Sequence, residues 1–368
     1  MPNNTYDVII VGAGGAGLMT ARELGRKQIK TLLIDRKKDL FSFTFNTLGS
    51  FMKIEDFGLT ENVVAQKLDR FYICSRLISV KVDCEALTLD KSALHKELFA
   101  SLDRNFVDVE TGKTINDFET DESGNILSII DDSGNVYHSK IFVDASGNAG
   151  ILSKKFGMQT DSLDFATGVE YNVKYLGNEN EAYILMGKKY QGGYGWIFPL
   201  KDGRAIIGFG SIDKTVIKSL KKRLNHILEF PEIRKLVEKD NNNCEGGSIP
   251  VTPVLTKFVH QNLVCVGDSV SQVNPVAGEG YKFIFESAVM VANSICNSLK
   301  NNNLNILNQY ETEWKNRFQK NYNFAKFAQQ KAFKYSKSNL LVDFGMLYLK
   351  SKPSEKIIKV ISGEYNRG

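Results

Sequence analysis

The feature that most constrains this chain is a glycine-rich turn close to its N-terminus. An apolar run at 6–11 (YDVIIV) leads directly into GAGGAG at 12–17, and a helical pattern follows. A second apolar run, 31–34, ends in Asp35. This order of a strand, a tight turn, a helix, a second strand and an acidic residue predicts a βαβ unit that binds a dinucleotide. In such a unit Asp35 would accept hydrogen bonds from the adenosine ribose.

Each residue of the turn has its own role in such a site. Gly12 makes the turn, Gly14 lets the backbone approach a pyrophosphate, and Gly17 lets the helix pack close to the strand. The helix begins at Gly15 and Ala16, where N–H groups and a partial positive charge favour phosphates. A glycine-rich turn also occurs for packing alone, but the flanking strand and helix favour the dinucleotide.

Two later segments repeat the pattern of a buried strand that runs into a small polar turn. The strand at 140–143 leads into DASG at 144–147, and the strand at 262–266 leads into Gly-Asp at 267–268. The turn NPVAGEG, 274–280, then precedes a long apolar helical pattern. Taken alone, the Gly-Asp pair is equally compatible with an ordinary turn.

These three blocks, in this order, resemble the flavoprotein superfamily typified by aromatic hydroxylases. The resemblance implies that FAD is the dinucleotide, that Asp268 holds its ribityl chain, and that the backbone at 277–280 faces the pyrimidine edge of the flavin. A helix N-terminus at that edge stabilises the negative charge of a reduced flavin. Lys91 stands where relatives often have an arginine for the pyrophosphate. The residues expected to bind FAD are Gly12, Gly14, Gly15, Ala16, Gly17, Asp35, Arg36, Lys91, Ala145, Gly147, Gly267, Asp268, Gly278, Glu279 and Gly280.

Between these blocks the pattern changes to short strands. Apolar runs at 166–173, 181–186, 196–200 and 205–210 are separated by glycines and charged turns, which predicts an antiparallel sheet over the flavin.

One of these runs, GGYGWIFPL, resembles the Y-x-W-x-F-P motif of the geranylgeranyl reductase family, whose members use reduced FAD to saturate isoprenoid double bonds. Tyr194, Trp196 and Phe198 alternate, so on a strand they share one face. That face is either core or the wall of an apolar pocket, and the flanking glycines favour the pocket. Pro199 ends the strand. These four residues and Phe45 are the expected substrate contacts.

One departure from that family concerns a cysteine that its members often carry near the flavin. The corresponding stretch here, 41–51, has none. If that cysteine selects the bond to be reduced, this chain acts on a different substrate or is not a reductase. The alternating Phe41, Phe43 and Phe45 either line an apolar tunnel or belong to the core.

The C-terminal part has helical periodicity and a basic bias. Residues 301–368 hold 12 basic and 5 acidic residues, while the whole chain has a net charge of +5. The lysines form either a solvated helix face or a surface for an anionic membrane. An aromatic stripe here usually packs on the protein's own body, and the alternative is a surface that docks on lipid. The stripe consists of Tyr310, Trp314, Phe318, Tyr322, Phe324 and Phe327.

Other features of the sequence exclude several classes of protein. The five cysteines and four histidines have no metal-ligand spacing, so we expect no metal site and a reduced, cytoplasmic protein. No apolar run is long enough to cross a bilayer, although a peripheral contact with a membrane surface stays open. The weak overall charge gives no reason to expect a nucleic acid partner.

The expected fold is α/β, with a Rossmann-like FAD-binding domain assembled from separated segments and an inserted antiparallel-sheet substrate domain. A C-terminal helical region completes it. The FAD-binding segments are 1–70, 89–156 and 261–300, the substrate domain takes 71–88 and 157–260, and the helical region takes 301–368.

The leading functional hypothesis is an FAD-dependent reductase that saturates carbon–carbon double bonds of an isoprenoid (geranylgeranyl-type) chain or lipid. The electron donor is NAD(P)H or a ferredoxin-like protein, and Tyr194 and Glu279 are candidate proton donors by position alone. One alternative is an FAD-dependent monooxygenase or halogenase of the same superfamily. Another is a non-redox FAD-dependent cyclase or a lipid-binding flavoprotein.

Overall fold

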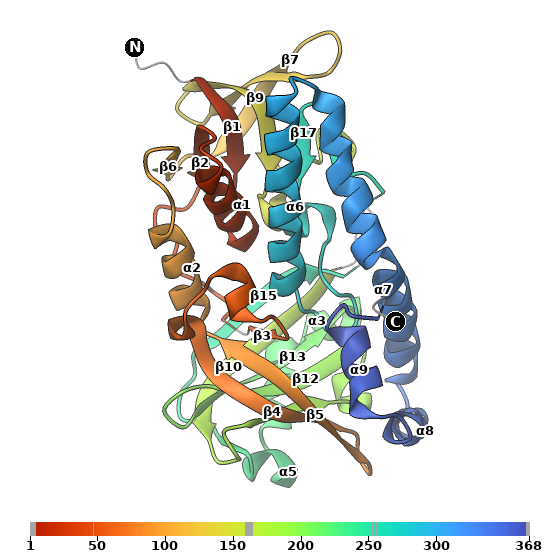
Figure 1. Cartoon of the computed structure of the whole chain (residues 1–368). Coiled ribbons are helices and arrows are strands. Elements are labelled where there is room, and N and C mark those ends of the chain that lie inside the picture. Colours follow the sequence, from red (N-terminus) through yellow and green to blue (C-terminus); the bar gives the residue numbers. More distant parts are fainter. Residues whose placement is uncertain (1–4, 47, 159–164, 252–253, 255, 366–368) are drawn as a thin grey trace.

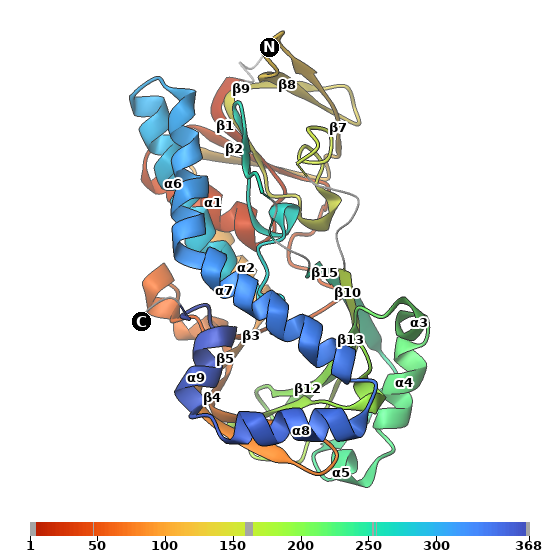
Figure 2. The same ribbon diagram turned by 90° about the vertical axis from the view of Figure 1, so that its right-hand side faces the viewer.

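The computed structural model describes residues 5–46, 48–158, 165–251, 254 and 256–365. Within these ranges the chain forms two sheets, which lie at opposite ends of an elongated molecule with helices around them (Figure 1). Helix α7 (Asn308–Tyr335) runs along the side of the molecule from one end toward the other (Figure 2).

The first sheet is built from segments that are far apart in the sequence. Its strands follow the order β16–β17–β9–β1–β2–β6, and β7 and β8 form a hairpin beside β9. Every pair on this path is parallel except β16–β17. The strands are β1 (Thr5–Val11), β2 (Thr31–Asp35), β6 (Val107–Thr111), β7 (Ile115–Thr120), β8 (Ile126–Asp131), β9 (Val136–Asp144), β16 (Val259–His260) and β17 (Leu263–Cys265). The carboxyl ends of parallel strands share one sheet edge, so the three sequence blocks converge there, as predicted for a domain assembled from separated segments.

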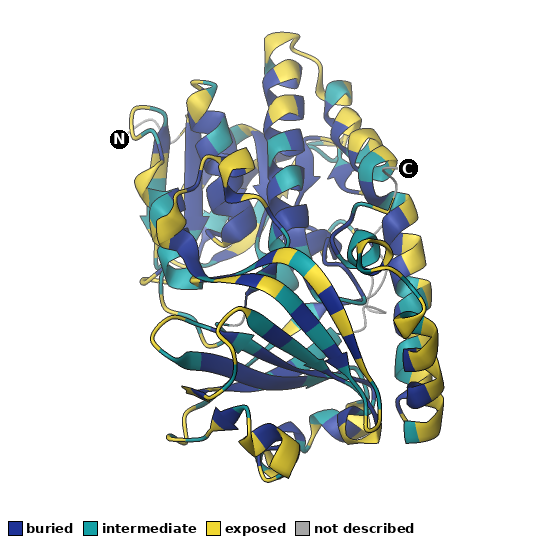
Figure 3. Cartoon of the chain, turned by 60° about the horizontal axis from the view of Figure 1, so that its bottom comes forward, coloured by how far each residue is buried: buried dark blue, intermediate teal, exposed yellow. Residues whose placement is uncertain are grey.

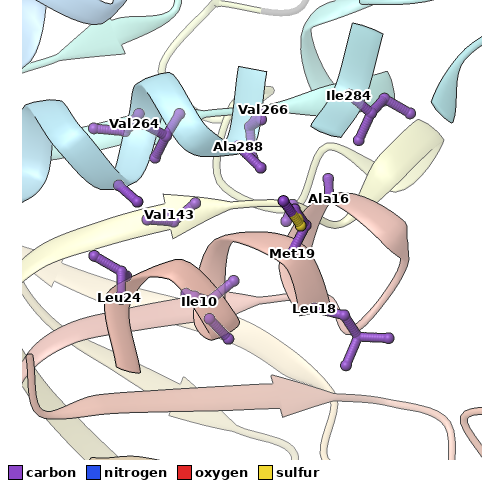
Figure 4. Close-up of a cluster of buried hydrophobic side chains, with 14 of the residues drawn as sticks. Ile10, Ala16, Leu18, Met19, Leu24, Val143, Val264, Val266, Ile284 and Ala288 are labelled. Carbon is purple, nitrogen blue, oxygen red and sulfur yellow. The ribbon is translucent and has the colours of Figure 1, made fainter. Parts of the chain in front are cut away.

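Two helices cover one face of this sheet. Helices α1 (Gly15–Arg26) and α6 (Tyr281–Lys300) pack against each other and against the central strands. Figure 4 shows side chains of both helices meeting those of β1, β9 and β17 in one buried cluster. The approach of α1 to the turn before it depends on Gly17, since a Cβ there would lie 1.8 Å from the carbonyl oxygen of Gly12.

The second sheet follows the order β14–β10–β13–β12–β11–β4–β5–β3, with β15 beside β10. Its strands are β3 (Gly49–Ser50), β4 (Val64–Cys74), β5 (Ser79–Leu89), β10 (Phe165–Tyr175), β11 (Glu181–Leu185), β12 (Gly193–Pro199), β13 (Arg204–Ser211), β14 (Val237–Glu238) and β15 (Cys244–Pro250). The sheet is antiparallel apart from the β11–β4 pair, which is parallel. Because β3 begins at Gly49 and pairs with β5, the chain enters the second sheet before residue 70.

Burial alternates along the strands of the second sheet, as Figure 3 shows. One face packs against three short helices, α3 (Lys214–Ile217), α4 (Leu220–Ile227) and α5 (Pro231–Arg234). The other face of β10, β12 and β13 looks toward the first sheet. This two-sided pattern explains why Ile197 lies in the core while its neighbours Trp196 and Phe198 line a cavity.

Helix α2 (Lys91–Ala100) lies beside α1, and α8 (Asn339–Lys350) and α9 (Ser354–Ile361) follow α7. The aromatic residues of α7 at 310, 314, 318 and 322 are buried, so this part of the stripe packs on the body of the protein. Phe324 and Phe327 are exposed instead. No helix in the described ranges has both the length and the apolar character that crossing a bilayer requires.

Candidate functional site

Two adjoining cavities lie at the carboxyl ends of the parallel strands of the first sheet, and the larger one is also lined by residues of the second sheet. The larger has a volume of about 420 Å³, and the smaller has about 210 Å³. Both are lined by residues of the glycine-rich turn, of the segment after β2, of α2 and of the turn after β9. The shared lining residues are Gly14, Lys37, Phe43, His95, Ala145 and Gly147.

The smaller cavity contains the carboxyl end of β2. Asp35 accepts hydrogen bonds from the backbone N–H of Ala13 (2.6 Å) and of Lys37 (2.7 Å), so the loops after β1 and β2 are tied together. Gly12 and Arg36 also line this cavity. Asp35 therefore lies beside the glycine-rich turn, and its contact with a ribose stays a prediction.

The glycines of the turn differ in whether their surroundings leave room for a side chain. A Cβ on Gly12, whose φ is +107°, would lie 2.4 Å from the carbonyl oxygen of Ala145, and a Cβ on Gly15 would lie 2.8 Å from the ring of Tyr281. By contrast, nothing lies within 4 Å of a Cβ built on Gly14. Helix α1 begins after Gly14 with no side-chain cap. Gly14 thus leaves open space beside an uncapped helix N-terminus, the arrangement that accepts a phosphate.

Lys91 of α2 and Asp268 of the turn after β17 both line the larger cavity. The ammonium of Lys91 donates to the carbonyl oxygen of Phe45 at 3.0 Å, and burial lowers its pKa although Asp268 opposes the shift. Burial raises the pKa of Asp268 to about 6, and the charge of Lys91 opposes that shift. The two side chains compensate each other's desolvation at the cavity wall.

Glu279 is the most unusual carboxyl of the site. Its Oε1 accepts the hydroxyl of Ser50 at 2.5 Å and the N–H of Phe51 at 2.9 Å, whereas its buried Oε2 has no hydrogen-bond partner among the described residues. Burial raises the pKa of this carboxyl to about 7, against the effect of the two donors and of Lys282. Glu279 lines the larger cavity. A carboxyl that titrates near neutral pH can carry a proton.

The hydroxyl of Tyr194, the other candidate proton donor, binds a backbone carbonyl oxygen. It donates a hydrogen bond of 2.5 Å to the carbonyl oxygen of Ala277, which joins β12 to the turn before α6. Burial raises the pKa of this phenol well above its ordinary value. The proton of Tyr194 is therefore engaged in a hydrogen bond that holds the turn.

The aromatic motif forms one wall of the larger cavity. Tyr194, Trp196 and Phe198 all line it, together with Phe45 from the segment before β3. The indole of Trp196 lies flat over a neighbouring strand, since a Cβ on Gly208 would lie 2.2 Å from it. Glycine in β13 thus leaves room for the indole ring, and a larger side chain at Gly208 would clash with it.

The lining residues that the sequence analysis missed include three with polar side-chain groups: Lys37, His95 and Tyr281. Nε2 of His95 lies 2.7 Å from the hydroxyl of Tyr281, and Nδ1 has no partner among the described residues. Burial, aided by Lys91 and Lys37, lowers the pKa of His95 to about 3. The spacing of His95 and Tyr281 in the sequence offers no signal, because the two side chains meet only where α2 and α6 come together.

Most of the residues predicted to bind FAD or substrate line one of the two cavities. Three do not: Gly17 and Gly267 serve close packing, and Pro199 ends β12 outside the lining. Of the three phenylalanines at 41–45, Phe43 and Phe45 line the larger cavity, whereas Phe41 packs against Phe99.

The residues present fit FAD. Gly14 and the uncapped α1 offer a phosphate site, Asp35 lies at one end of it, and Lys91, Asp268 and the turn before α6 lie on the other side. The unpartnered Oε2 of Glu279 and Nδ1 of His95 are polar atoms that a ligand could satisfy. Within the described ranges no cluster of His, Cys, Asp and Glu is suited to hold a metal ion.

Comparison with known proteins gives consistent matches. The family model described as "Lycopene cyclase protein" matches residues 7–341. Digeranylgeranylglycerophospholipid reductase of Methanococcus vannielii is 26% identical over 342 residues, covering 87% of this chain and 84% of the relative. The protein of the same name from Methanocaldococcus jannaschii is 25% identical over 332 residues, with coverages of 85% and 83%.

Solved structures share the fold. A geranylgeranyl bacteriochlorophyll reductase-like protein from Thermoplasma acidophilum superposes with a TM-score of 0.87 at 20% identity, covering 98% of this chain and 96% of that one. The flavin-dependent brominase Bmp2 superposes with a TM-score of 0.78 at 17% identity, covering 98% and 94%.

Proposed function

Because this chain belongs to the lycopene cyclase protein family, we propose that it is an FAD-dependent reductase that saturates carbon–carbon double bonds of an isoprenoid chain or lipid. The relatives from M. vannielii and M. jannaschii, named as reductases of a digeranylgeranyl lipid, support this substrate class. The observation that carries the proposal is an aromatic wall and a buried carboxyl in one cavity beside a dinucleotide fingerprint.

FAD would be held by the residues at the edge of the first sheet. The N-terminus of α1 and Gly14 would bind the pyrophosphate, Asp35 the adenosine ribose, and Asp268 the ribityl chain, with Lys91 beside it. When bound in its reduced form, FAD supplies a hydride.

An isoprenoid chain would lie against Trp196, Phe198 and Phe45. These side chains exclude water and offer apolar surface, and burial of such a chain is favourable by roughly 0.8 kcal/mol per methylene group. Because an isolated double bond is poorly polarised, positioning against this wall would supply much of the rate enhancement.

Glu279 would supply the proton. In its protonated form the Oε2–H of the carboxyl donates to one alkene carbon while a hydride reaches the other, so the product gains H2 and the carboxylate remains. Ser50 and Phe51 hold Oε1 and so stabilise the carboxylate that forms. Tyr194 would act as a positioning residue for the turn that carries Glu279.

The reducing partner and the location belong to the same proposal. NAD(P)H or a ferredoxin-like protein would reduce the cofactor. All five cysteines are free, which supports a cytoplasmic protein. A peripheral contact with a membrane would bring a lipid substrate to the cavity.

A non-redox cyclase is the second candidate function. The description of the matching family model favours it, and a buried acid in an apolar cavity also suits protonation of a double bond without net reduction.

Anaerobic photoreduction of the FAD-loaded protein, followed by addition of a digeranylgeranyl lipid, tests the proposal. We expect reoxidation of the flavin and a product heavier by H2 for each bond. An isomer of unchanged mass would establish the cyclase instead. A product that contains oxygen or halogen, formed only in air, would contradict both.

A further inference from the structure

Helix α8 presents an apolar face to solvent. Leu340, Phe344, Leu347 and Tyr348 are 66%, 61%, 53% and 64% exposed, and Leu341 is 46% exposed. Their spacing along the helix places them on one side, in a continuous stripe. We call these five residues the α8 apolar face.

The opposite side of α8 is also apolar. Val342 and Met346 are buried in the core that α8 shares with β4 and β5. A surface helix of a globular protein ordinarily has polar residues on its outer side, and large exposed apolar patches mark interaction sites. Val342 and Met346 already pack α8 on the rest of the chain, so packing within the chain does not account for the α8 apolar face.

The tip of the β4–β5 hairpin extends this surface. Leu77 at the tip is 72% exposed, and the hairpin is held against α8 by Asp343, whose carboxylate accepts the hydroxyl of Ser75 at 2.5 Å and the N–H of Leu77 at 3.4 Å. Two elements that are distant in the sequence, the hairpin tip and α8, are thereby held together.

Within residues 336–353, the stretch that contains α8, the exposed charged residues are basic. Asp343 is the only carboxylate within residues 336–353, and it is buried and turned toward the hairpin. Lys337 and Lys350 are exposed at the two ends of α8, and Arg76 is exposed beside Leu77. Exposed apolar side chains within a cationic rim match the surface of an anionic bilayer, where the leucines enter the acyl boundary and the lysines stay at the headgroups.

We propose that the α8 apolar face, with Leu77, docks this protein on an anionic lipid bilayer. A second copy of the chain is the less suitable occupant, because a symmetric contact would bring two cationic rims together. The docking does not rest on the redox chemistry proposed above.

The docking surface is connected to the cavity through the end of α7. Phe333 lines the larger cavity, and Ser336, three residues later, accepts the backbone N–H of Gly192 at 2.9 Å. Asn339, the first residue of α8, accepts the N–H of Lys188 at 2.8 Å. The docking surface is thus tied to the segment before β12, whose Gly192 lines the larger cavity.

Co-sedimentation of the full chain with vesicles tests the proposal. We expect the protein to bind vesicles of phosphatidylcholine mixed with phosphatidylglycerol, and to bind vesicles of phosphatidylcholine alone more weakly. Added salt should reduce the difference in affinity between the two kinds of vesicle. Phe344→Ser and Leu347→Ser should each lower the affinity about tenfold, the equivalent of one apolar side chain withdrawn from the bilayer. Leu127→Ser, at an exposed leucine of β8, should bind as the parent does.

Lys350→Glu combined with Lys337→Glu provides a second test that leaves the apolar face intact. It should lower binding to the anionic vesicles and leave binding to phosphatidylcholine unchanged. The proposal is overturned if the parent protein does not prefer anionic vesicles, or if Phe344→Ser binds them as tightly as Leu127→Ser. Self-association of the parent without lipid, lost in Phe344→Ser by sedimentation velocity, would assign the surface to a second copy instead.

Discussion

The hydroxyl of Ser50 donates a hydrogen bond of 2.5 Å to Oε1 of Glu279, a residue 229 positions further along the chain. This bond ties the edge strand β3 of the second sheet to the turn that opens α6. The N–H of Phe51 binds the same oxygen, so Oε1 has two donors and Oε2 has no hydrogen-bond partner among the described residues.

Glu279→Gln should abolish the proton donor while keeping the hydrogen bonds of Ser50 and Phe51, because the amide oxygen accepts both. We expect product formation to fall by about 100-fold or more, a typical contribution of a general acid, with FAD content unchanged. Single-turnover reoxidation of the reduced protein with lipid measures the step. Glu313→Gln, at an exposed position of α7, is the matched control and should react as the parent does.

The parent protein should also show a pH dependence that the Gln variant lacks. The pKa of Glu279 is raised to about 7, so the protonated form predominates below that pH and is lost as the pH rises through it. Product formation should therefore decline above about pH 7. A flat profile between pH 5 and 9, measured at saturating lipid, would argue against Glu279 as the acid.

Asp268→Ala should yield protein that is poor in FAD and nearly colourless. The carboxylate is placed to accept hydrogen bonds at the cavity wall, and each charge-assisted hydrogen bond contributes roughly 1.5–3 kcal/mol. The ratio of flavin to protein absorbance reports the loss, and circular dichroism checks the fold. Glu122→Ala, in an exposed turn, should remain yellow; full FAD occupancy in Asp268→Ala would remove this residue from the site.

Two glycines of the same turn should respond differently to alanine. In Gly17→Ala the new Cβ would meet the carbonyl oxygen of Gly12 at 1.8 Å, so we expect a loss of stability of about 1–3 kcal/mol. In Gly14→Ala the Cβ meets nothing, so stability should be retained while FAD binds more weakly. Urea unfolding of the FAD-free proteins and titration with FAD separate the two effects. Equal stability of both variants would contradict the packing role of Gly17.

His95 should make the protein less stable in mild acid. Its pKa in the folded protein is about 3, below the ordinary 6.5. Between these two pH values the unfolded chain binds a proton at His95 and the folded chain does not. Stability is therefore lost as the pH falls from 6.5 toward 3, by about 2 kcal/mol between pH 7 and pH 5. His95→Gln should lack this part of the decline. The measurement is the difference in urea unfolding free energy between the two pH values for both proteins.

Features that depend on residues close together in the sequence could be predicted from the sequence alone. The glycine turn at 12–17, the acid at Asp35 and the apolar strands at 140–143 and 262–266 each have a pattern that a few neighbouring residues determine. The alternation of Tyr194, Trp196 and Phe198 likewise determined that the three side chains share a face. These features follow from backbone geometry and residue type, which act over short stretches.

Contacts between distant segments were decided only by the tertiary structure. Whether an aromatic face is core or cavity wall depends on what lies opposite, and periodicity is the same in both cases. For the same reason the stripe on α7 is buried at Trp314, whereas the exposed apolar face belongs to α8, around Phe344. The meeting of His95 with Tyr281, and the engagement of only one oxygen of Glu279, arise where separate elements pack, and desolvation there shifts the pKa values that the chemistry uses.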